Sequence, residues 1–159
     1  EMGLDALEIN VYTEDLGHHI ELLDMGYLIA ISANQEVNGF SAAKYKDIFG
    51  ENGTFRLLTP EEMKLSIDEL PEQGIFSYKD DYLNLNEVAR DFPLMNVLPV
   101  NSVQQVIQLL QHFHRSERIP LFLKHPNGYL DIIPKDISSI PINDQFKLVY
   151  LGKQLEHAK

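Results

Sequence analysis

The sequence YLIAISANQEVN at residues 27–38 decides the fold class of this 159-residue chain. Residues 27–32 form a continuous apolar run, which predicts a strand that is covered on both faces, as in a parallel sheet. Asn34 is placed to cap a following helix, and Gly50 is placed to end it. The expected inner face of this helix consists of Val37, Phe40, Ala43 or Lys44, and Ile48.

The same alternation continues on both sides of this stretch. Upstream, residues 7–12 predict a strand and residues 14–25 a helix. Downstream, Asn52-Gly53 predicts a turn, and residues 54–58 predict a strand that Pro60 stops. Strands that alternate with helices through short links are typical of a parallel sheet with right-handed crossovers. We therefore expect an α/β fold.

A second pattern begins in a segment punctuated by Pro60, Pro71 and Gly74, so we expect two regions, residues 1–68 and residues 69–159. The second region predicts a smaller α+β subdomain, with helices at 82–92 and 102–114 and strands at 120–124, 129–133 and 146–151. Asn127-Gly128 predicts a β-hairpin, because both residues tolerate the positive φ values of a tight two-residue turn.

Charge and composition exclude several classes of function. The formal net charge of −11 disfavours a general nucleic-acid binder, and it equally disfavours docking on anionic lipid. No apolar run reaches the roughly 18 residues that a membrane span needs, so we expect no direct membrane insertion. The acids concentrate in the first third, where Lys44 is the first base. They predict either a solvated acidic face or a surface that meets a basic partner segment.

The sequence contains no motif that predicts catalysis. Cysteine is absent, and His18-His19 and the pair His112 and His114 lack metal-ligand spacing. Glu61-Glu62 and Asp80-Asp81 are typical of first helical turns. No nucleophile elbow and no glycine-rich phosphate loop occurs, so we expect neither an enzyme nor a metal or cofactor site in this chain.

The candidate site is the passage from strand to helix at the carboxyl edge of the predicted sheet, where open α/β sheets bind ligands. Asn34 and Asn38 supply amides there, and Glu36 lies between them. We expect these three residues at a ligand or an interface. For Asn34 the alternative is a purely structural role as the helix cap.

The order of several short motifs resembles a known family. The run at 28–38 is followed by Ala42-Ala43, Phe49-Gly50 and Phe55-Arg56-Leu57. This first part is similar to the later part of a Trk-type nucleotide-binding regulatory domain, and more narrowly to the version in cytoplasmic tails of bacterial sodium/proton antiporters. The closing stretch of such tails is similar to a second group of motifs: Ile119-Pro120-Leu121-Phe122, Asn127-Gly128, Pro141-Ile142-Asn143-Asp144 and Leu148-Val149-Tyr150-Leu151.

The resemblance also has departures. The glycine-rich turn and first strand of the family would precede Glu1, Thr13-Glu14-Asp15 stands where a Gly-Asp pair is usual, and Asn143 replaces a glycine. The resemblance therefore implies the back half of a Rossmann-like unit followed by a C-terminal subdomain. A nucleotide cofactor is implied only together with upstream sequence.

In function, the resemblance implies a non-catalytic regulatory domain at the cytoplasmic face of the inner membrane, excised here from a longer transporter. Its expected partners are the transmembrane part of that transporter and a second copy, which would pair through the sheet edge at residues 7–12. Ligand, ion or pH would act by changing how the domain packs. The alternatives are a stand-alone soluble module for ligand binding or oligomerisation, and a fragment of a nucleotide-dependent enzyme.

Overall fold

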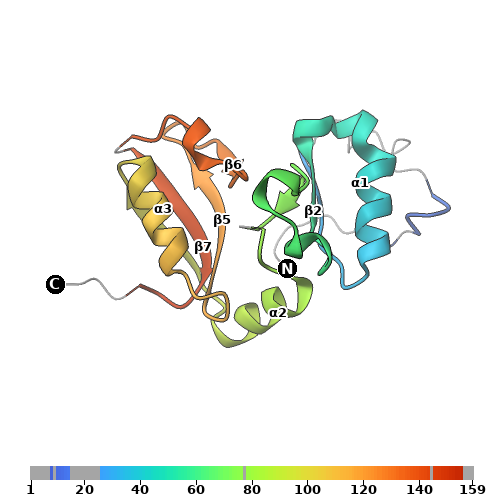
Figure 1. The fold of residues 1–159 in the computed structure, drawn as a ribbon, viewed down its shortest axis with the longest axis horizontal. Helices are drawn as coiled ribbons and strands as arrows, with labels where there is room; N and C mark the ends of the chain where they lie inside the picture. Colours follow the sequence, from blue (N-terminus) through green and yellow to red (C-terminus); the bar gives the residue numbers. More distant parts are fainter. Residues whose placement is uncertain (1–7, 9, 15–25, 77, 144, 156–159) are drawn as a thin grey trace.

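The computed structural model describes the whole chain except residues 1–7, 9, 15–25, 77, 144 and 156–159. The described residues form a three-stranded parallel sheet, with strand order β1-β2-β3, and a separate four-stranded antiparallel sheet, with strand order β4-β7-β5-β6. Helix α1 lies on the outer side of the parallel sheet and α3 on the outer side of the antiparallel sheet, with α2 at the base between them (Figure 1). The predicted mixed α/β class is confirmed.

The parallel part is built from one strand–helix–strand crossover and a short third strand. Its elements are β1 (Leu28–Ala30), α1 (Gln35–Phe49), β2 (Thr54–Leu57) and β3 (Gly74–Ile75). Residue Leu28 pairs with Thr54 in parallel register, as the alternation predicted. The expected turn at residues 52–53 lies in a 3-10 turn, η3 (Glu51–Gly53).

Two predictions for the parallel part are wrong. The buried face of α1 is Asn38, Ser41, Ala42 and Tyr45, whereas Phe40 and Ile48 of the expected inner face are exposed. Residues 10–14 form a turn, in which the Thr13 and Glu14 amides donate to the Asn10 carbonyl, so no strand runs to residue 12. Residues 7 and 9 of the predicted strand, the helix at 14–25 beyond Glu14, and His18-His19 lie outside the described residues.

Strand β3 was not foreseen from the sequence and follows residue 68, so the parallel sheet continues past the expected division of the chain. It is reached through two 3-10 turns, η4 (Glu62–Lys64) and η5 (Ile67–Glu69). A Cβ on Gly74 would lie 2.5 Å from the Tyr78 ring, so only glycine lets this ring cover the strand.

The antiparallel part follows helix α2 (Tyr82–Asp91). Its elements are β4 (Met95–Val100), α3 (Val103–His112), β5 (Arg118–Lys124), β6 (Leu130–Ile132), the 3-10 turn η6 (Ile137–Ser139) and β7 (Phe146–Gly152). Both predicted helices are confirmed, with Asp81 and Ser102 as their N-caps. Strand β4 was missed because it is an edge strand that contains Pro99, a residue that argues against strand.

The predicted hairpin joins β5 to β6, but its turn is longer than expected. The His125 amide donates to the Tyr129 carbonyl at 2.8 Å, and the Gly128 amide donates to the His125 carbonyl at 3.0 Å. Only Gly128 has a positive φ, of 89°, and Asn127 does not. The loop is therefore a three-residue turn that needs one glycine rather than two residues in the left-handed region.

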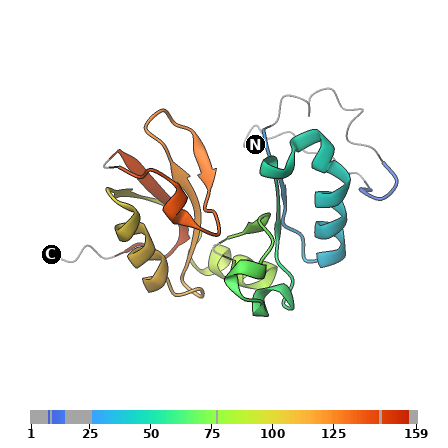
Figure 2. The ribbon, with the colours of Figure 1, turned by 45° about the horizontal axis from the view of Figure 1, so that its top comes forward.

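The described residues form three apolar clusters. One lies under α3 and is centred on Val106, Leu123 and Leu148. A small one holds Leu58, Leu70 and Tyr78. The third joins the two parts, because Leu57 and Ile75 of the parallel sheet pack with Val88 of α2 and with Ile119 and Leu121 of β5. Figure 2 shows α2 in this joining position from a second direction.

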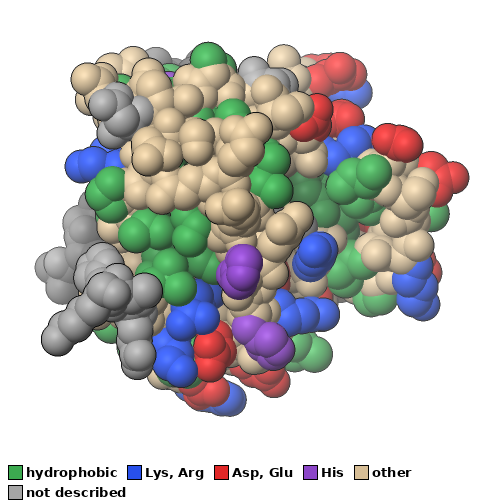
Figure 3. Space-filling model, turned by 60° about the vertical axis from the view of Figure 1, so that its left-hand side comes forward, with side chains coloured by type: hydrophobic (Ala, Val, Ile, Leu, Met, Phe, Trp, Pro, Cys, Tyr) green, Lys and Arg blue, Asp and Glu red, His purple; other side chains and the backbone are tan. Residues whose placement is uncertain are grey.

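The surface around α3 carries little charge. The exposed residues of α3 are Gln104, Gln108, Gln111 and His112. Figure 3, which brings this side of the molecule forward, shows a broad uncharged area next to a group of hydrophobic side chains, with acidic, basic and histidine side chains beside them. Among the described residues, no helix is both long enough and apolar enough to cross a bilayer.

Candidate functional site

The carboxyl edge of the parallel sheet holds a pocket of about 250 Å³. We call it the carboxyl-edge pocket, and its walls are Ser32, Ala33, Gln35, Asn38, Leu57, Leu58, Pro60, Asp81, Tyr82 and Leu83. The walls come from three places: residues 32–38 between β1 and the first turn of α1, residues 57–60 at the end of β2, and residues 81–83 at the start of α2. This is the position at which α/β sheets bind ligands, and the sequence placed the candidate site at the same edge.

Asn38 is the polar centre of this wall, and it is only 2 % exposed. Its side-chain oxygen accepts from the amide and from the hydroxyl of Ser32, both at 2.8 Å, and its Nδ2 donates to the Ser32 carbonyl at 2.9 Å. Because the backbone of Ser32 is held at both its amide and its carbonyl, Asn38 fixes the turn that leads from β1 into α1. The geometry thus gives Asn38 a positioning role.

Asn34 completes the same turn. Its Oδ1 accepts from the amides of Glu36 at 2.9 Å and Val37 at 3.2 Å, which satisfies two of the free donors at the start of α1. Its own amide donates to the Ser32 hydroxyl at 3.2 Å. Asn34 is therefore the N-cap of α1. Glu36 is exposed in the first turn and does not line the carboxyl-edge pocket.

Ser32 lies within the run at residues 27–38, but the sequence did not predict it as a site residue. The signal that links it to Asn38 is a spacing of six residues across the strand–helix turn. Such a spacing has no fixed meaning before the fold is known, because neither strand nor helix periodicity brings i and i+6 together.

The opposite wall is the start of α2, where Asp80-Asp81 act as helix-start residues, as predicted. Asp81 Oδ1 accepts from the Asn84 amide at 2.8 Å, and the buried Asp80 accepts from Asn84 Nδ2 at 2.6 Å. Asp81 also pairs with Arg115 at 3.3 Å. No basic side chain is among the described residues that line this pocket. The pocket therefore favours a neutral or cationic polar group over an anion.

Within the described ranges, no group of three or more His, Asp or Glu side chains is arranged to hold a metal ion. His112 Nδ1 contacts the Gln108 carbonyl at 2.6 Å and His114 Nδ1 contacts the Ser116 hydroxyl at 2.7 Å, so the two histidines face different partners. His125 pairs with Asp131 at 2.5 Å within the hairpin.

Among the described residues, polar contacts of Lys135, Arg115 and Tyr129 link the parallel part to the antiparallel part besides the shared apolar cluster. Lys135 Nζ donates to the Leu70 carbonyl at 2.9 Å and pairs with the Glu72 carboxylate at 3.1 Å. The Arg115–Asp81 pair lies near the start of α2. The Tyr27 and Tyr129 hydroxyls are 2.9 Å apart, and this hydrogen bond, together with burial, raises the pKa of Tyr27 to about 12. None of these tertiary links was evident from the sequence.

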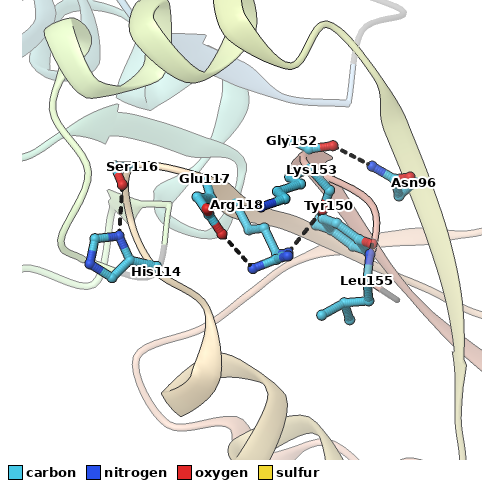
Figure 4. Close-up of polar contacts among 9 residues, drawn as sticks. All are labelled: Asn96, His114, Ser116, Glu117, Arg118, Tyr150, Gly152, Lys153 and Leu155. Carbon is cyan, nitrogen blue, oxygen red and sulfur yellow. Dashed lines mark hydrogen bonds and ion pairs between the residues drawn. The ribbon is translucent and has the colours of Figure 1, made fainter. Parts of the chain in front are cut away.

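A second polar cluster ties together the ends of three strands (Figure 4). Arg118 Nε donates to the Lys153 carbonyl at 2.9 Å and its Nη1 donates to Glu117 at 3.0 Å. Asn96 Nδ2 donates to the Gly152 carbonyl at 2.7 Å. The Lys153 ammonium holds the pKa of the Glu117 carboxyl below its usual range. These contacts use side chains to fix the β4, β5 and β7 termini, so we assign the cluster a structural role.

Comparisons of the chain with models of protein families, with curated proteins and with solved structures gave no significant match.

Proposed function

We propose that this chain is the non-catalytic cytoplasmic regulatory domain of a cation/proton antiporter, with sodium/hydrogen exchange as the expected transport. The ordered motifs that resemble antiporter tails support this proposal. One structural observation carries its mechanism: the carboxyl-edge pocket is walled on one side by the parallel part and on the other by the start of α2. A group that binds there touches both walls at once.

The route from the pocket to the rest of the molecule follows α2. Val88 of this helix is fully buried and packs with Ile119 and Leu121 of the antiparallel sheet. A ligand that moves Asp81 or Tyr82 would therefore shift a helix that both sheets contact. Coupling of this kind needs a binding site and a packed element with two arrangements, and α2 is the element that fits.

The remaining parts of the proposal follow from the resemblance. The domain would sit at the cytoplasmic face of the inner membrane, contact the transmembrane part of its own transporter and pair with a second copy. Its parallel part would be the back half of a Rossmann-like unit. A pocket of about 250 Å³ is smaller than most small-molecule sites, so a nucleotide would need residues from upstream sequence as well.

The test uses the natural protein that contains this chain, in everted membrane vesicles. Sodium addition should dissipate a preformed pH gradient, which a pH-sensitive dye reports. Tyr82→Ala, which alters the α2 wall, should change the sodium concentration for half-maximal exchange. The exposed Asn86→Ala on the same helix is the matched control. The proposal would be contradicted if the vesicles showed no sodium/proton exchange. It would also be contradicted if Tyr82→Ala and Asn86→Ala had the same sodium concentration for half-maximal exchange.

A further inference from the structure

A second cavity, of about 370 Å³, lies between the two parts of the molecule and shares no described lining residue with the carboxyl-edge pocket. We propose that it binds an amphiphilic carboxylate, a small molecule with a hydrocarbon body and one anionic group. We call it the basic pocket. Its volume falls in the range of small-molecule sites, and its occupant is a separate question from the function proposed above.

The walls of the basic pocket are largely apolar. They are formed by Ile67, Tyr78, Ile107, Leu110, Phe113, Pro120, Ile133, Pro134 and Ile137. These side chains come from η5, the segment before α2, the last turns of α3, β5 and the segment after β6. Pro120, Ile133 and Ile137 are buried. Such a lining removes hydrocarbon from water, which stabilises binding by roughly 25 cal/mol for each Å² of apolar surface that becomes buried.

The described residues that line the pocket are richer in bases than the chain as a whole. Lys79, Arg115, Arg118 and Lys135 all line the pocket, although the chain has only 13 bases against 24 acids. A cavity that combines apolar walls with basic side chains complements an acid with an apolar body.

Two of these basic side chains are held by neighbouring carbonyls and carboxylates, and the other two have N–H donors that a ligand could use. Arg118 and Lys135 have side chains only 13 % and 15 % exposed, and both are anchored by backbone carbonyls and a carboxylate. Arg115 is 52 % exposed and contacts Asp81 through one nitrogen at 3.3 Å. Its planar guanidinium carries five N–H donors, so it can still bind a second carboxylate with two parallel hydrogen bonds. Lys79 is exposed beside the same cavity.

The acid in the wall is Asp80. It is 2 % exposed, and Asn84 Nδ2 donates to its carboxylate at 2.6 Å. This hydrogen bond ties the Asp80 carboxylate to the first turn of α2. Among the described residues, three of the four bases that line the pocket are paired with carboxylates outside its wall: Arg115 with Asp81, Arg118 with Glu117 and Lys135 with Glu72. The anionic group would therefore be held by Lys79 and by the remaining N–H donors of Arg115.

The backbone of the pocket wall supports a binding role independently. Tyr78 is the one non-glycine residue with a positive φ, of 59°, among the described residues. A bulky residue in this region is strained, and such strain clusters at ligand sites. The Tyr78 hydroxyl donates to the Glu72 carbonyl at 3.1 Å and its ring covers Gly74, which together hold the conformation. Burial raises the pKa of Tyr78 to about 12, so the phenol stays neutral in the wall.

The experiment is calorimetric titration of the 159-residue chain with decanoate, using decylamine and decanol as probes of equal chain length. Decanoate should bind saturably, and each of the other two should bind at least tenfold more weakly. The double variant Lys79→Gln/Arg115→Gln should weaken decanoate binding at least tenfold, whereas Arg115→Lys alone should lose less.

The matched control is Lys124→Gln/Lys147→Gln, which removes two exposed bases outside the pocket and makes the same change in net charge. It should bind decanoate as the unaltered chain does, and thermal unfolding should show that all variants fold. Equal binding of decylamine, or unchanged decanoate binding by the pocket variant, would overturn the proposal. Neither result depends on transport, so this proposal and the proposed function can fail separately.

Discussion

The parallel part and the antiparallel part reach stability in different ways. The antiparallel sheet has strands of up to seven residues and its own buried cluster beneath α3. The parallel sheet has strands of two to four residues, and the face of α1 that packs against it includes the polar Asn38 and Ser41. Its apolar residues Leu57 and Ile75 are buried together with residues of α2 and β5.

Apart from the cluster that both parts share, the parallel part has the small cluster of Leu58, Leu70 and Tyr78, whereas the antiparallel part has the larger cluster under α3. The parallel part therefore depends more on the shared cluster than its neighbour does. A disturbance at the shared surface should therefore loosen the parallel part first. That asymmetry suits a domain whose two parts must respond to a bound ligand, because the less stable element is the one that moves.

The largest expected effect comes from breaking the antiparallel core. Leu148→Ala removes a fully buried side chain from the cluster under α3 and should lower the free energy of unfolding by about 2–5 kcal/mol. Urea unfolding measures this loss. Leu83→Ala, at a side chain 72 % exposed, should stay within about 0.5 kcal/mol of the unaltered chain. A loss below 1 kcal/mol in Leu148→Ala would show that this cluster is not a separate core.

A smaller effect, confined to the parallel part, is expected from Asn38→Ala. It leaves the amide and carbonyl of Ser32 without their partner and should cost about 1–3 kcal/mol. Hydrogen exchange should accelerate at residues 28–38 and not at residues 146–152. Equal acceleration in β7 would contradict the difference between the two parts. Gln104→Ala, an exposed change on α3, is the control.

Glu62 gives a pH-dependent version of the same test. It pairs with Arg56 through both oxygens, at 2.6 and 2.8 Å, and this contact holds the pKa of the Glu62 carboxyl below its usual range. The pKa of Glu62 is lower in the folded chain than in the unfolded chain, so the ion pair stabilises the fold at pH values above the unfolded-state pKa. This contribution to the free energy of unfolding is lost as the pH falls through the folded-state pKa.

Glu62→Gln should therefore lower the free energy of unfolding by about 1–2 kcal/mol at pH 7, because both partners are partly buried. The gap between variant and unaltered chain should close as the pH falls below about 4. The exposed neighbour Glu61→Gln is the control. A gap that stays constant with pH in chemical unfolding would rule out this ion pair as its source.

The smallest effect should come from Lys135→Met, which removes a polar link between the parts but keeps an apolar stem. We expect a loss of about 1 kcal/mol, because the ammonium group is replaced where it meets the Leu70 carbonyl and Glu72. Amide hydrogen exchange at residues 67–75 should accelerate, while hydrogen exchange in α3 should stay unchanged. Lys124→Met, at an exposed base, is the control. If hydrogen exchange at residues 67–75 rose equally in this control variant, a specific role for the Lys135 link would be excluded.

The sequence predicted those features that nearby residues determine. Asn34 and the pair Asp80-Asp81 were recognised at helix starts, because capping needs only a short side chain and the next three amides. The hairpin was predicted from Asn127-Gly128 in the same way, although only Gly128 has a positive φ. Strand β4 could not be foreseen, because Pro99 argues against a strand and its tolerance depends on a place at the sheet edge.

The site was predicted only in part for a related reason. The edge of the sheet was located correctly, but the bonds from Asn38 to Ser32 cross the turn between strand and helix. The basic pocket joins Ile67 to Ile107 and Lys79 to Lys135, residues that only the tertiary fold brings to one cavity. Local periodicity contains no information about such pairs.

The most direct measurement for the central proposal is fractionation of the source cells, with detection by an antibody raised against this chain. If the chain is the regulatory domain of an antiporter, the antibody should detect a band in the membrane pellet that is much larger than a 159-residue protein. A band of the size of this chain alone, in the supernatant, would contradict that proposal and favour an independent binding module.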